Sequence, residues 1–495
     1  MKKSILSLAV AAGVSTTAMA QMHINHQGTG EALVYPLYTT QNGNDTYIAV
    51  VNTTANAKAV KVRMLEAENS VEVLDFNLYL SPWDHFSFAI TANSEGGASL
   101  VTNDISCTVP QIDGPIPFRD LNYREADVGN NDISRVQIGH IEVIEMGQID
   151  DESAVFDDVL HGSTMDCGAL TDRWSVPASD ETNPQVGEWL DDASVGFMED
   201  WMGGGLYGYG QVVNVEQGTA FGYDAVAIAG LVETADVLRR GDDEITEVNQ
   251  SGWAMHYEPG DVRPNFNDDA ITQDVMTEAG PVVPADEIRA VAALFQTTDL
   301  ENDYVTDPDI NALTDWVITA PTKQYHTNDL VPVEPFNDLW DGETACEPVA
   351  LMAWDREEGE ITPDEIPGTG PDFSPSPDRD PQEPDNNDMP LCFETNIVQF
   401  GDESALGGED VVVGVPSELL PGVDGWMRIM MDEADLQTDR SEWDNRRAIE
   451  GLQGLPVTGF AVIKYTNSSA NEAGALANYA VSTAHKSVVI SSLVD

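Results

Sequence analysis

Two sets of aspartates are the densest groups of side chains that could bind a cation. The first set is Asp378, Asp380, Asp385 and Asp388, and the second is Asp299, Asp303, Asp307 and Asp309. Carboxylate oxygens are hard ligands that suit Ca²⁺, which exported proteins meet at high concentration. Neither set has the glycine and glutamate positions of an EF-hand, so a solvated acidic loop is the alternative. Calcium is therefore the candidate cofactor, and the first set is its candidate site.

A second metal hypothesis concerns His23. Cleavage of a signal peptide after Ala20 would give an N-terminus that reads Gln21, Met22, His23. Its free amine, two deprotonated amides and imidazole would form a square-planar donor set for copper(II) or nickel(II). Cyclisation of Gln21 would remove the amine, and a frayed chain end is the alternative interpretation.

Sequence motifs for nucleophilic or zinc-dependent hydrolysis are missing. The chain has no G-x-S-x-G and no H-E-x-x-H, and Gly401-Asp402-Glu403-Ser404 lacks the spacing of an esterase box. The remaining histidines are scattered, so we interpret each as structural or exposed: His85, His140, His161, His256, His326 and His485. A carboxylate pair could hydrolyse glycosides, but 86 acidic residues hide any such pair. We therefore assign no catalytic residue.

The segment Gly203–Gly210 alternates glycine with tyrosine near its end. A phosphate-binding loop needs a preceding strand, a following helix and usually a lysine beside Ser or Thr. Here a strand-like run, Gln211–Val215, follows instead. The segment is therefore predicted to be a strand or tight loop, and Tyr207 and Tyr209 on one face could stack against a sugar.

The four cysteines favour disulfides, because the chain carries an export signal. Four cysteines allow three pairings. We favour Cys107 with Cys167 and Cys346 with Cys392, since each pair brackets a loop-rich acidic stretch. A zinc site is the weaker alternative, because no C-x-x-C pair is present.

The N-terminus and the charge indicate export. Lys2 and Lys3 precede an apolar run, Ile5–Val14, and Ala18-Met19-Ala20 forms a small-x-small cleavage site. The formal net charge of −64 disfavours nucleic acid and anionic membranes as partners, and it favours cations. No later apolar run reaches the roughly 20 residues of a membrane helix. We expect a periplasmic, cell-surface or extracellular protein without a transmembrane segment.

The fold is predicted to be mainly β, an antiparallel β-sandwich core with helical and loop-rich insertions. Strand-like runs recur between residues 31 and 91, and turn residues separate them: Glu31–Thr39, Thr46–Asn52, Ala59–Leu65, Ser70–Leu80 and His85–Ile90. Val60, Val62 and Met64 alternate with Lys61 and Arg63, which predicts two different faces. Residues 150–160 and 286–296 look helical.

The predicted domain plan has five parts. They are a signal peptide (1–20), a β-sandwich region (21–106), a mixed α/β insertion (107–345), an acidic Pro-rich loop or linker (346–394) and a C-terminal β region (395–495). The last part resembles the first in its strand and turn pattern. Two related sandwiches would explain this, but we prefer one sandwich closed by both ends of the chain.

Several runs carry a resemblance to known proteins. Gly28–Thr39, Val51–Thr54, Leu74–Pro82 and Thr319–Lys323 resemble blocks of an uncharacterised family of exported proteins of Gram-negative bacteria. The Asn-Thr-Thr turn is also similar to immunoglobulin-like strand patterns. The resemblance implies export and a shared architecture, and it implies no activity.

These features favour an exported, non-enzymatic protein that acts by binding or assembly. A cation, a surface glycan or another protein would be the partner. The alternatives are a secreted polysaccharide hydrolase with a carboxylate pair and a calcium-dependent adhesion module. The oligomeric state does not follow from the sequence.

Overall fold

The computed structural model describes most of the chain after the predicted signal peptide. The described residues are 22–120, 132–175, 186–198, 203–231, 256–267, 275–277, 280–282, 289–328, 334–361, 389–408, 410–415, 417, 420–431, 448–449, 452–467 and 478–489. The predicted signal peptide and the candidate calcium ligands Asp378, Asp380, Asp385 and Asp388 lie outside these residues, as does most of the predicted Pro-rich linker.

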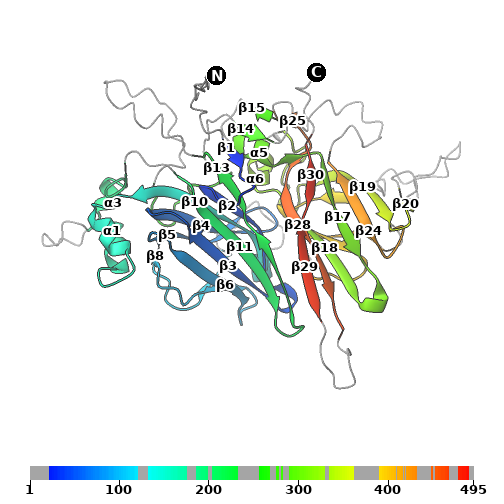
Figure 1. Ribbon diagram of the computed structural model, residues 1–495, viewed down its shortest axis with the longest axis horizontal. Coiled ribbons are helices and arrows are strands. Elements are labelled where there is room, and N and C mark those ends of the chain that lie inside the picture. Colours follow the sequence, from blue (N-terminus) through cyan, green and yellow to red (C-terminus); the bar gives the residue numbers. More distant parts are fainter. Residues whose placement is uncertain are drawn as a thin grey trace, which may run out of the picture.

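The N-terminal half forms a β-sandwich of two sheets, as the alternation of residues 31–91 predicts (Figure 1). Sheet 1 runs in the order β15 (Gly280–Val282), β14 (Val275–Thr277), β1 (Met22–Ile24), β13 (Val226–Ala229), β2 (Ala32–Thr39), β10 (Ile138–Ile149), β4 (Ala57–Glu66), β5 (Glu72–Leu80), β8 (Cys107–Val109). Sheet 2 runs in the order β12 (Thr219–Asp224), β11 (Leu206–Asn214), β3 (Asn44–Asn52), β6 (His85–Ala92), β7 (Ala98–Val101), β9 (Ile116–Pro117). Val60, Val62 and Met64 face the core, so their alternation with charged residues is confirmed.

The C-terminal half forms a second sandwich. Sheet 3 runs in the order β23 (Val412–Val415), β22 (Thr395–Phe400), β18 (Ala312–Thr319), β28 (Thr458–Tyr465), β29 (Tyr479–Ala484). Sheet 4 runs in the order β20 (Glu360–Ile361), β19 (Glu347–Asp355), β24 (Asp424–Met430), β17 (Asp299–Val305), β30 (Lys486–Val488), and β21 (Met389–Leu391) also pairs with β19. The fold is thus mainly β and largely antiparallel, as predicted.

Sheet 3 joins the two sandwiches because both of its faces are buried. Val317 and Phe460 belong to the core of the first sandwich, whereas Trp316 and Ala461, their neighbours along the chain, belong to the core of the second. The ring of Phe460 stacks on Tyr223 of β12, with centroids 4.7 Å apart. An antiparallel strand buried on both faces lacks the usual polar alternation, which explains the apolar character of β18.

The strand pairing crosses the boundaries of the predicted regions. Strands of the expected insertion (107–345) divide between the sandwiches, since β10 to β13 complete the first and β17 and β18 begin the second. Strand β28 does not add to the sheets of the N-terminal sandwich, because it pairs with β18 and β29. The C-terminal region instead packs against the first sandwich face to face, and side-chain contacts of this kind leave no periodic signal in a sequence.

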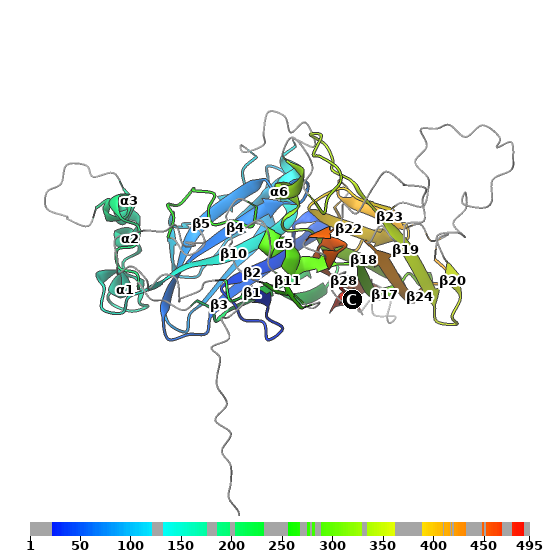
Figure 2. The same cartoon turned by 90° about the horizontal axis from the view of Figure 1, so that it is seen from above.

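The helices are short and lie outside the sandwiches. Three of them, α1 (Ala154–Val159), α2 (Cys167–Arg173) and α3 (Glu188–Asp191), lie together at the end of the molecule away from the second sandwich (Figure 2). Helices α5 (Arg289–Phe295) and α6 (Lys323–Thr327) lie near the junction of the halves. In the part of the chain described, none of the helices combines the length and the apolar character that crossing a membrane requires.

Both predicted disulfides are present. Cys107 of β8 is bonded to Cys167 of α2, which ties the helical insertion to sheet 1. Cys346 is bonded to Cys392, which holds together the two ends of the acidic stretch. The pairings are those that the spacing favours.

Candidate functional site

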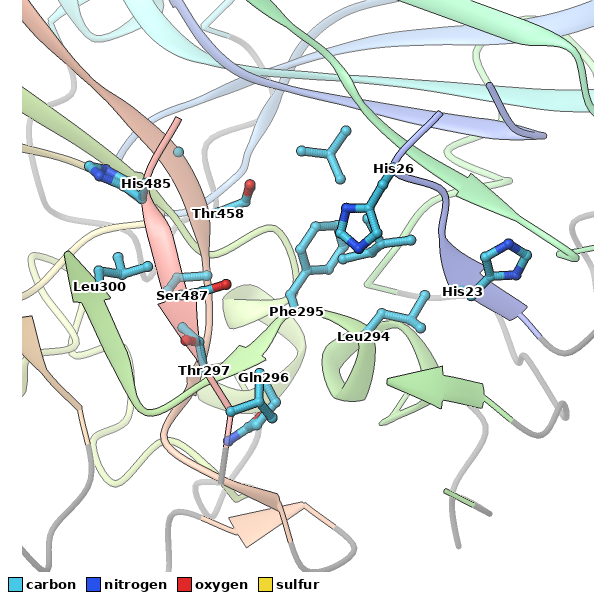
Figure 3. Close-up of a pocket in the computed structure, with 15 residues that line it drawn as sticks. His23, His26, Leu294, Phe295, Gln296, Thr297, Leu300, Thr458, His485 and Ser487 are labelled. Carbon is cyan, nitrogen blue, oxygen red and sulfur yellow. The ribbon is translucent and has the colours of Figure 1, made fainter. Parts of the chain in front are cut away.

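A cavity of roughly 330 Å³ lies between the two sandwiches and is a candidate binding site (Figure 3). Its walls come from segments more than 400 residues apart in the sequence. They are His23, Ile24, His26, Val226, Leu294, Phe295, Gln296, Thr297, Leu300, Val457, Thr458, Gly459, His485, Ser487 and Val489. This volume lies at the lower end of the range for small-molecule sites, which commonly form at domain interfaces.

Each wall of the cavity has a separate structural origin. The first sandwich contributes His23 from β1 and Val226 from β13. Helix α5 ends at Phe295 and directs Leu294 and Phe295 toward the space, beside β16 (Gln296–Thr297). The second sandwich contributes β17, β28 and β30. The cavity therefore exists only when both sandwiches and α5 are assembled.

His485 is held in the wall by hydrogen bonds at both of its ring nitrogens. Its Nε2 lies 3.0 Å from the carbonyl oxygen of Val317, and its Nδ1 lies 3.1 Å from Nδ2 of Asn302. The Val317 carbonyl oxygen can only accept and Nδ2 of Asn302 can only donate, so the ring is neutral with its proton on Nε2. Burial lowers the pKa of His485 to about 4, since desolvation penalises the imidazolium. His485 is therefore a fixed, uncharged part of the wall.

Other polar groups in the wall can form hydrogen bonds with a ligand. Thr458 and Ser487 place hydroxyl groups at the cavity, and His26 lies at its exposed side. Gln296 is buried, and its Oε1 has no hydrogen-bond partner among the described residues, although its Nε2 donates to the carbonyl of Gly454. The remainder of the wall is mostly aliphatic or aromatic. The lining suits a small apolar molecule that carries a hydroxyl or carbonyl group.

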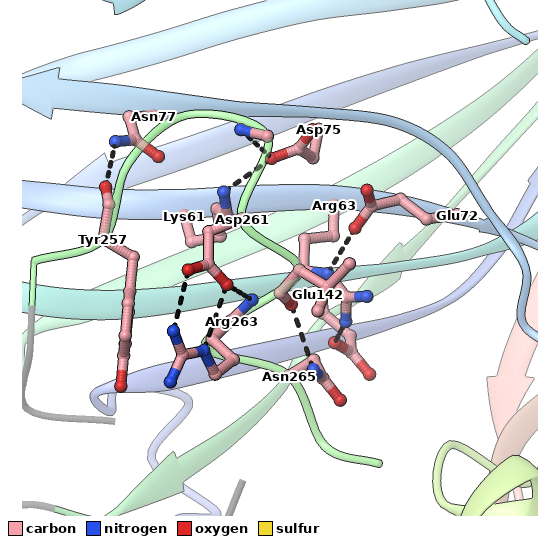
Figure 4. Close-up of polar contacts among 12 residues, drawn as sticks. Lys61, Arg63, Glu72, Asp75, Asn77, Glu142, Tyr257, Asp261, Arg263 and Asn265 are labelled. Atoms are coloured by element: carbon pink, nitrogen blue, oxygen red, sulfur yellow. Dashed lines mark hydrogen bonds and ion pairs between the residues drawn. The ribbon is translucent and has the colours of Figure 1, made fainter. Parts of the chain in front are cut away.

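A second cluster of charged groups covers the outer face of sheet 1 and is structural (Figure 4). Arg63 donates from Nε to Glu72 at 2.7 Å and from Nη1 to Glu142 at 2.6 Å. Lys61 donates to Asp75 at 2.5 Å. Burial raises the pKa of Glu142, although the adjacent Arg63 opposes this shift. Each cation has a carboxylate partner, so these charges hold strands β4, β5 and β10 together.

The segment 256–267 seals this charged face. Asn77 donates to the carbonyl of Tyr257 at 2.9 Å, and the amide of Gly260 donates to Asp75 at 3.3 Å. Lys61 and Arg63 are consequently buried, whereas strand alternation alone would place them in solvent. Nearby His140 is fully buried and both of its ring nitrogens lack hydrogen-bond partners among the described residues.

The predicted Gly-rich segment is a strand. Residues 206–214 form β11 between β3 and β12. Gly208 lets the backbone pass Tyr35, because a Cβ there would lie 1.8 Å from the Tyr35 hydroxyl oxygen. Tyr207 is exposed, and Tyr209 lies on the same face. The segment is therefore a close-packed strand, and the glycines serve packing.

The stretch Gly401-Asp402-Glu403-Ser404, which lacks the spacing of an esterase box, lies in a loop that is held by hydrogen bonds of Ser404. Ser404 donates to Oδ2 of Asp315 at 2.7 Å, and its Oγ accepts from the amide of Gly407 at 2.9 Å. Burial raises the pKa of Asp315 to about 6, although the Ser404 hydrogen bond opposes the shift. The hydroxyl therefore anchors the loop on β18.

The predicted metal ligands are not brought together among the described residues. In that part of the chain, no three His, Cys, Asp or Glu side chains are arranged to hold a metal ion. His23 lies in β1, where Met22 pairs with Val275 and His23 pairs with Ala229. Copper binding through the backbone nitrogens of Met22 and His23 would compete with this pairing. The calcium set at 378–388 remains a prediction.

Comparison with known proteins gives no match: no family model, no curated protein and no solved structure is detectably similar to this chain.

The cavity residues carry no signal that sequence reasoning could have used. Val226, Leu300 and Val457 look like ordinary strand residues, and their shared role depends on the packing of two sandwiches. His23 and His26 stand out in the sequence because they lie close to the predicted mature N-terminus. Nothing in the sequence indicates that they line a cavity together with His485.

Proposed function

We propose that this chain is an exported binding protein that holds a small, mainly apolar ligand in the cavity between its two sandwiches. The observation that carries the proposal is the cavity itself, which is lined by apolar side chains and a few hydroxyl and imidazole groups. Pockets with these properties are the usual form of a small-molecule site.

Export is supported by the sequence and by the disulfides. The basic, apolar and small-residue pattern of residues 1–20 is typical of a secretory signal. Disulfides such as Cys107–Cys167 persist in oxidising compartments. A net charge of −64 favours solubility in such a compartment.

The ligand class follows from the lining. Burial of each methylene group contributes about 0.8 kcal/mol to the free energy of binding, so the aliphatic wall favours an apolar ligand. Thr458 and Ser487 offer hydrogen bonds at one side. No carboxylate is present among the described lining residues, so polysaccharide hydrolysis by a carboxylate pair has no support at this cavity.

Fluorescence titration tests the proposal. The neutral dye N-phenyl-1-naphthylamine is added to the purified chain, and its emission reports transfer into an apolar site. Ser487→Trp places a large ring at an exposed position of the wall, where the fold tolerates it. We expect this variant to weaken dye binding at least about tenfold, equivalent to about 1.4 kcal/mol.

Thr483→Trp is the matched control, because Thr483 is exposed, uncharged and outside the cavity wall. It should bind the dye like the wild type. Equal binding by the wild type and Ser487→Trp would place the dye elsewhere and contradict the proposal, as would no binding at all.

A further inference from the structure

A buried lysine and two buried glutamates meet on neighbouring strands of sheet 1, away from the cavity. Lys58 lies on β4 and its Nζ contacts Oε1 of Glu145 on β10, and neither side chain has any exposed surface. Glu31 precedes β2, and its carbonyl accepts a hydrogen bond of 2.8 Å from the amide of Glu145. Strands β2, β10 and β4 are adjacent in sheet 1 (Figure 1). The Glu31 carboxyl group interacts electrostatically with both Lys58 and Glu145.

Gly204 lies between the two carboxyl groups. Its amide donates to Oε2 of Glu145 at 2.8 Å, and a Cβ at this position would lie 3.2 Å from Oε1 of Glu31. Its φ of +102° is one that other residues rarely adopt. A backbone N–H directed at one oxygen of a carboxyl group polarises that group and can stabilise negative charge on the oxygen.

The surroundings favour the uncharged forms of the two carboxyl groups. Burial raises the pKa of Glu145 to about 7 and also raises the pKa of Glu31, while Lys58 opposes both shifts. Transfer of a proton from the Lys58 ammonium to the Glu145 carboxylate would give a neutral amine beside a neutral carboxylic acid. Those two forms are the ones that can condense.

We propose that Lys58 and Glu145 form an intramolecular amide bond, and that Glu31 transfers the protons. The Lys58 nitrogen attacks Cδ of Glu145, and Oε2 carries the developing charge toward the Gly204 amide. Glu31 gives a proton to the departing Oε1 and regains one from the attacking nitrogen. One C–N bond forms, one C–O bond breaks, and water leaves, with no change of oxidation state.

The product fits the site better than the ion pair does. A neutral amide avoids the cost of keeping two charges away from water. Oε2 would keep its hydrogen bond to Gly204 as the amide oxygen. The bond would join β4 to β10 across a separation of 87 residues and, unlike the disulfides, would survive reduction.

Mass spectrometry of the full exported chain tests the proposal. After reduction, the intact mass should be about 18 Da below that of the linear chain, the mass of one water. Cyclisation of Gln21 would instead remove ammonia. Trypsin should fail to cut after Lys58 and should release residues 21–61 joined to residues 136–173. Cleavage after Lys58 with separate, full-mass peptides would overturn the proposal.

Three variants test the roles of the residues. Lys58→Arg should restore the full mass, because a guanidinium does not form the bond. Glu145→Gln can still react by releasing ammonia, so its loss should be about 17 Da. Glu31→Gln keeps the shape but removes the acid, and the folded variant should remain unlinked; a linked Glu31→Gln would overturn the role of Glu31. The pair formed by buried Lys61 and half-buried Asp75 is the internal control and should stay unlinked. The wild-type peptide map decides the outcome even if a variant does not fold.

Discussion

Replacement of His140 by leucine should stabilise the protein, and more strongly at acidic pH. His140 lies in β10, is fully buried, and both of its ring nitrogens lack hydrogen-bond partners among the described residues. Burial lowers its pKa from 6.5 to about 3, and the nearby Arg63 adds to the shift. Leucine has a similar volume and no polar atoms, so at pH 8 it should stabilise by about 1–3 kcal/mol.

The sign of the pH dependence follows from proton binding. Below pH 6.5 the unfolded chain binds a proton at His140 that the folded chain excludes, so the wild type loses stability as the pH falls toward 3. At pH 5 this loss is about 2 kcal/mol, from 1.5 pH units at about 1.4 kcal/mol each. The leucine variant lacks this term, so its advantage should grow by about 2 kcal/mol between pH 8 and pH 5.

Chemical denaturation at the two pH values measures this difference, and all other titrating groups cancel between the two proteins. His85→Leu is the matched control, because it makes the same substitution at an exposed position of the other sheet. If the advantage of His140→Leu were equal at pH 5 and pH 8, His140 would not be a buried neutral imidazole and the packing of sheet 1 would be wrong.

Two further changes probe the packing of the first sandwich. Gly208→Ala should destabilise by about 1–3 kcal/mol, because the new methyl group would lie 1.8 Å from the Tyr35 hydroxyl oxygen; denaturation measures the loss. Gly222→Ala is its control on the neighbouring strand, with the nearest atom at 3.4 Å, and an equal loss in both variants would contradict the predicted clash. Removal of the Cys107–Cys167 disulfide by a double serine substitution should cost about 4 kcal/mol for a separation of 60 residues, seen as a lower denaturation midpoint, and an unchanged midpoint would show that the bond does not constrain the chain.

The strands of the first sandwich follow closely from the sequence. Turn residues such as Asn52 to Asn56 separate runs that alternate apolar and polar residues, and β2 to β6 lie within a few residues of their predicted bounds. Local chemistry sets these elements, so a local pattern reveals them. The disulfide pairings could also be predicted from the sequence, because each pair of cysteines brackets a loop-rich stretch.

The environment of each strand face does not follow from the sequence. Lys61 and Arg63 have the pattern of a solvated face, yet residues 256–267 bury them. Val317 and Phe460 lie on strands of the second sandwich, but their side chains pack into the core of the first sandwich. Such long-range contacts also build the cavity, where His23 and His485 lie on opposite sides. Periodicity reports that a face is apolar, and it does not report what covers that face.

Methyl-selective NMR during ligand titration tests the central claim most directly. The resonances of Leu294, Leu300 and Val457, which line the cavity, should shift as N-phenyl-1-naphthylamine is added, while those of Leu78 and Leu100 in the first core should not. Shifts confined to residues outside the cavity, or no shift at saturating dye, would contradict the claim that the space between the sandwiches is a binding site.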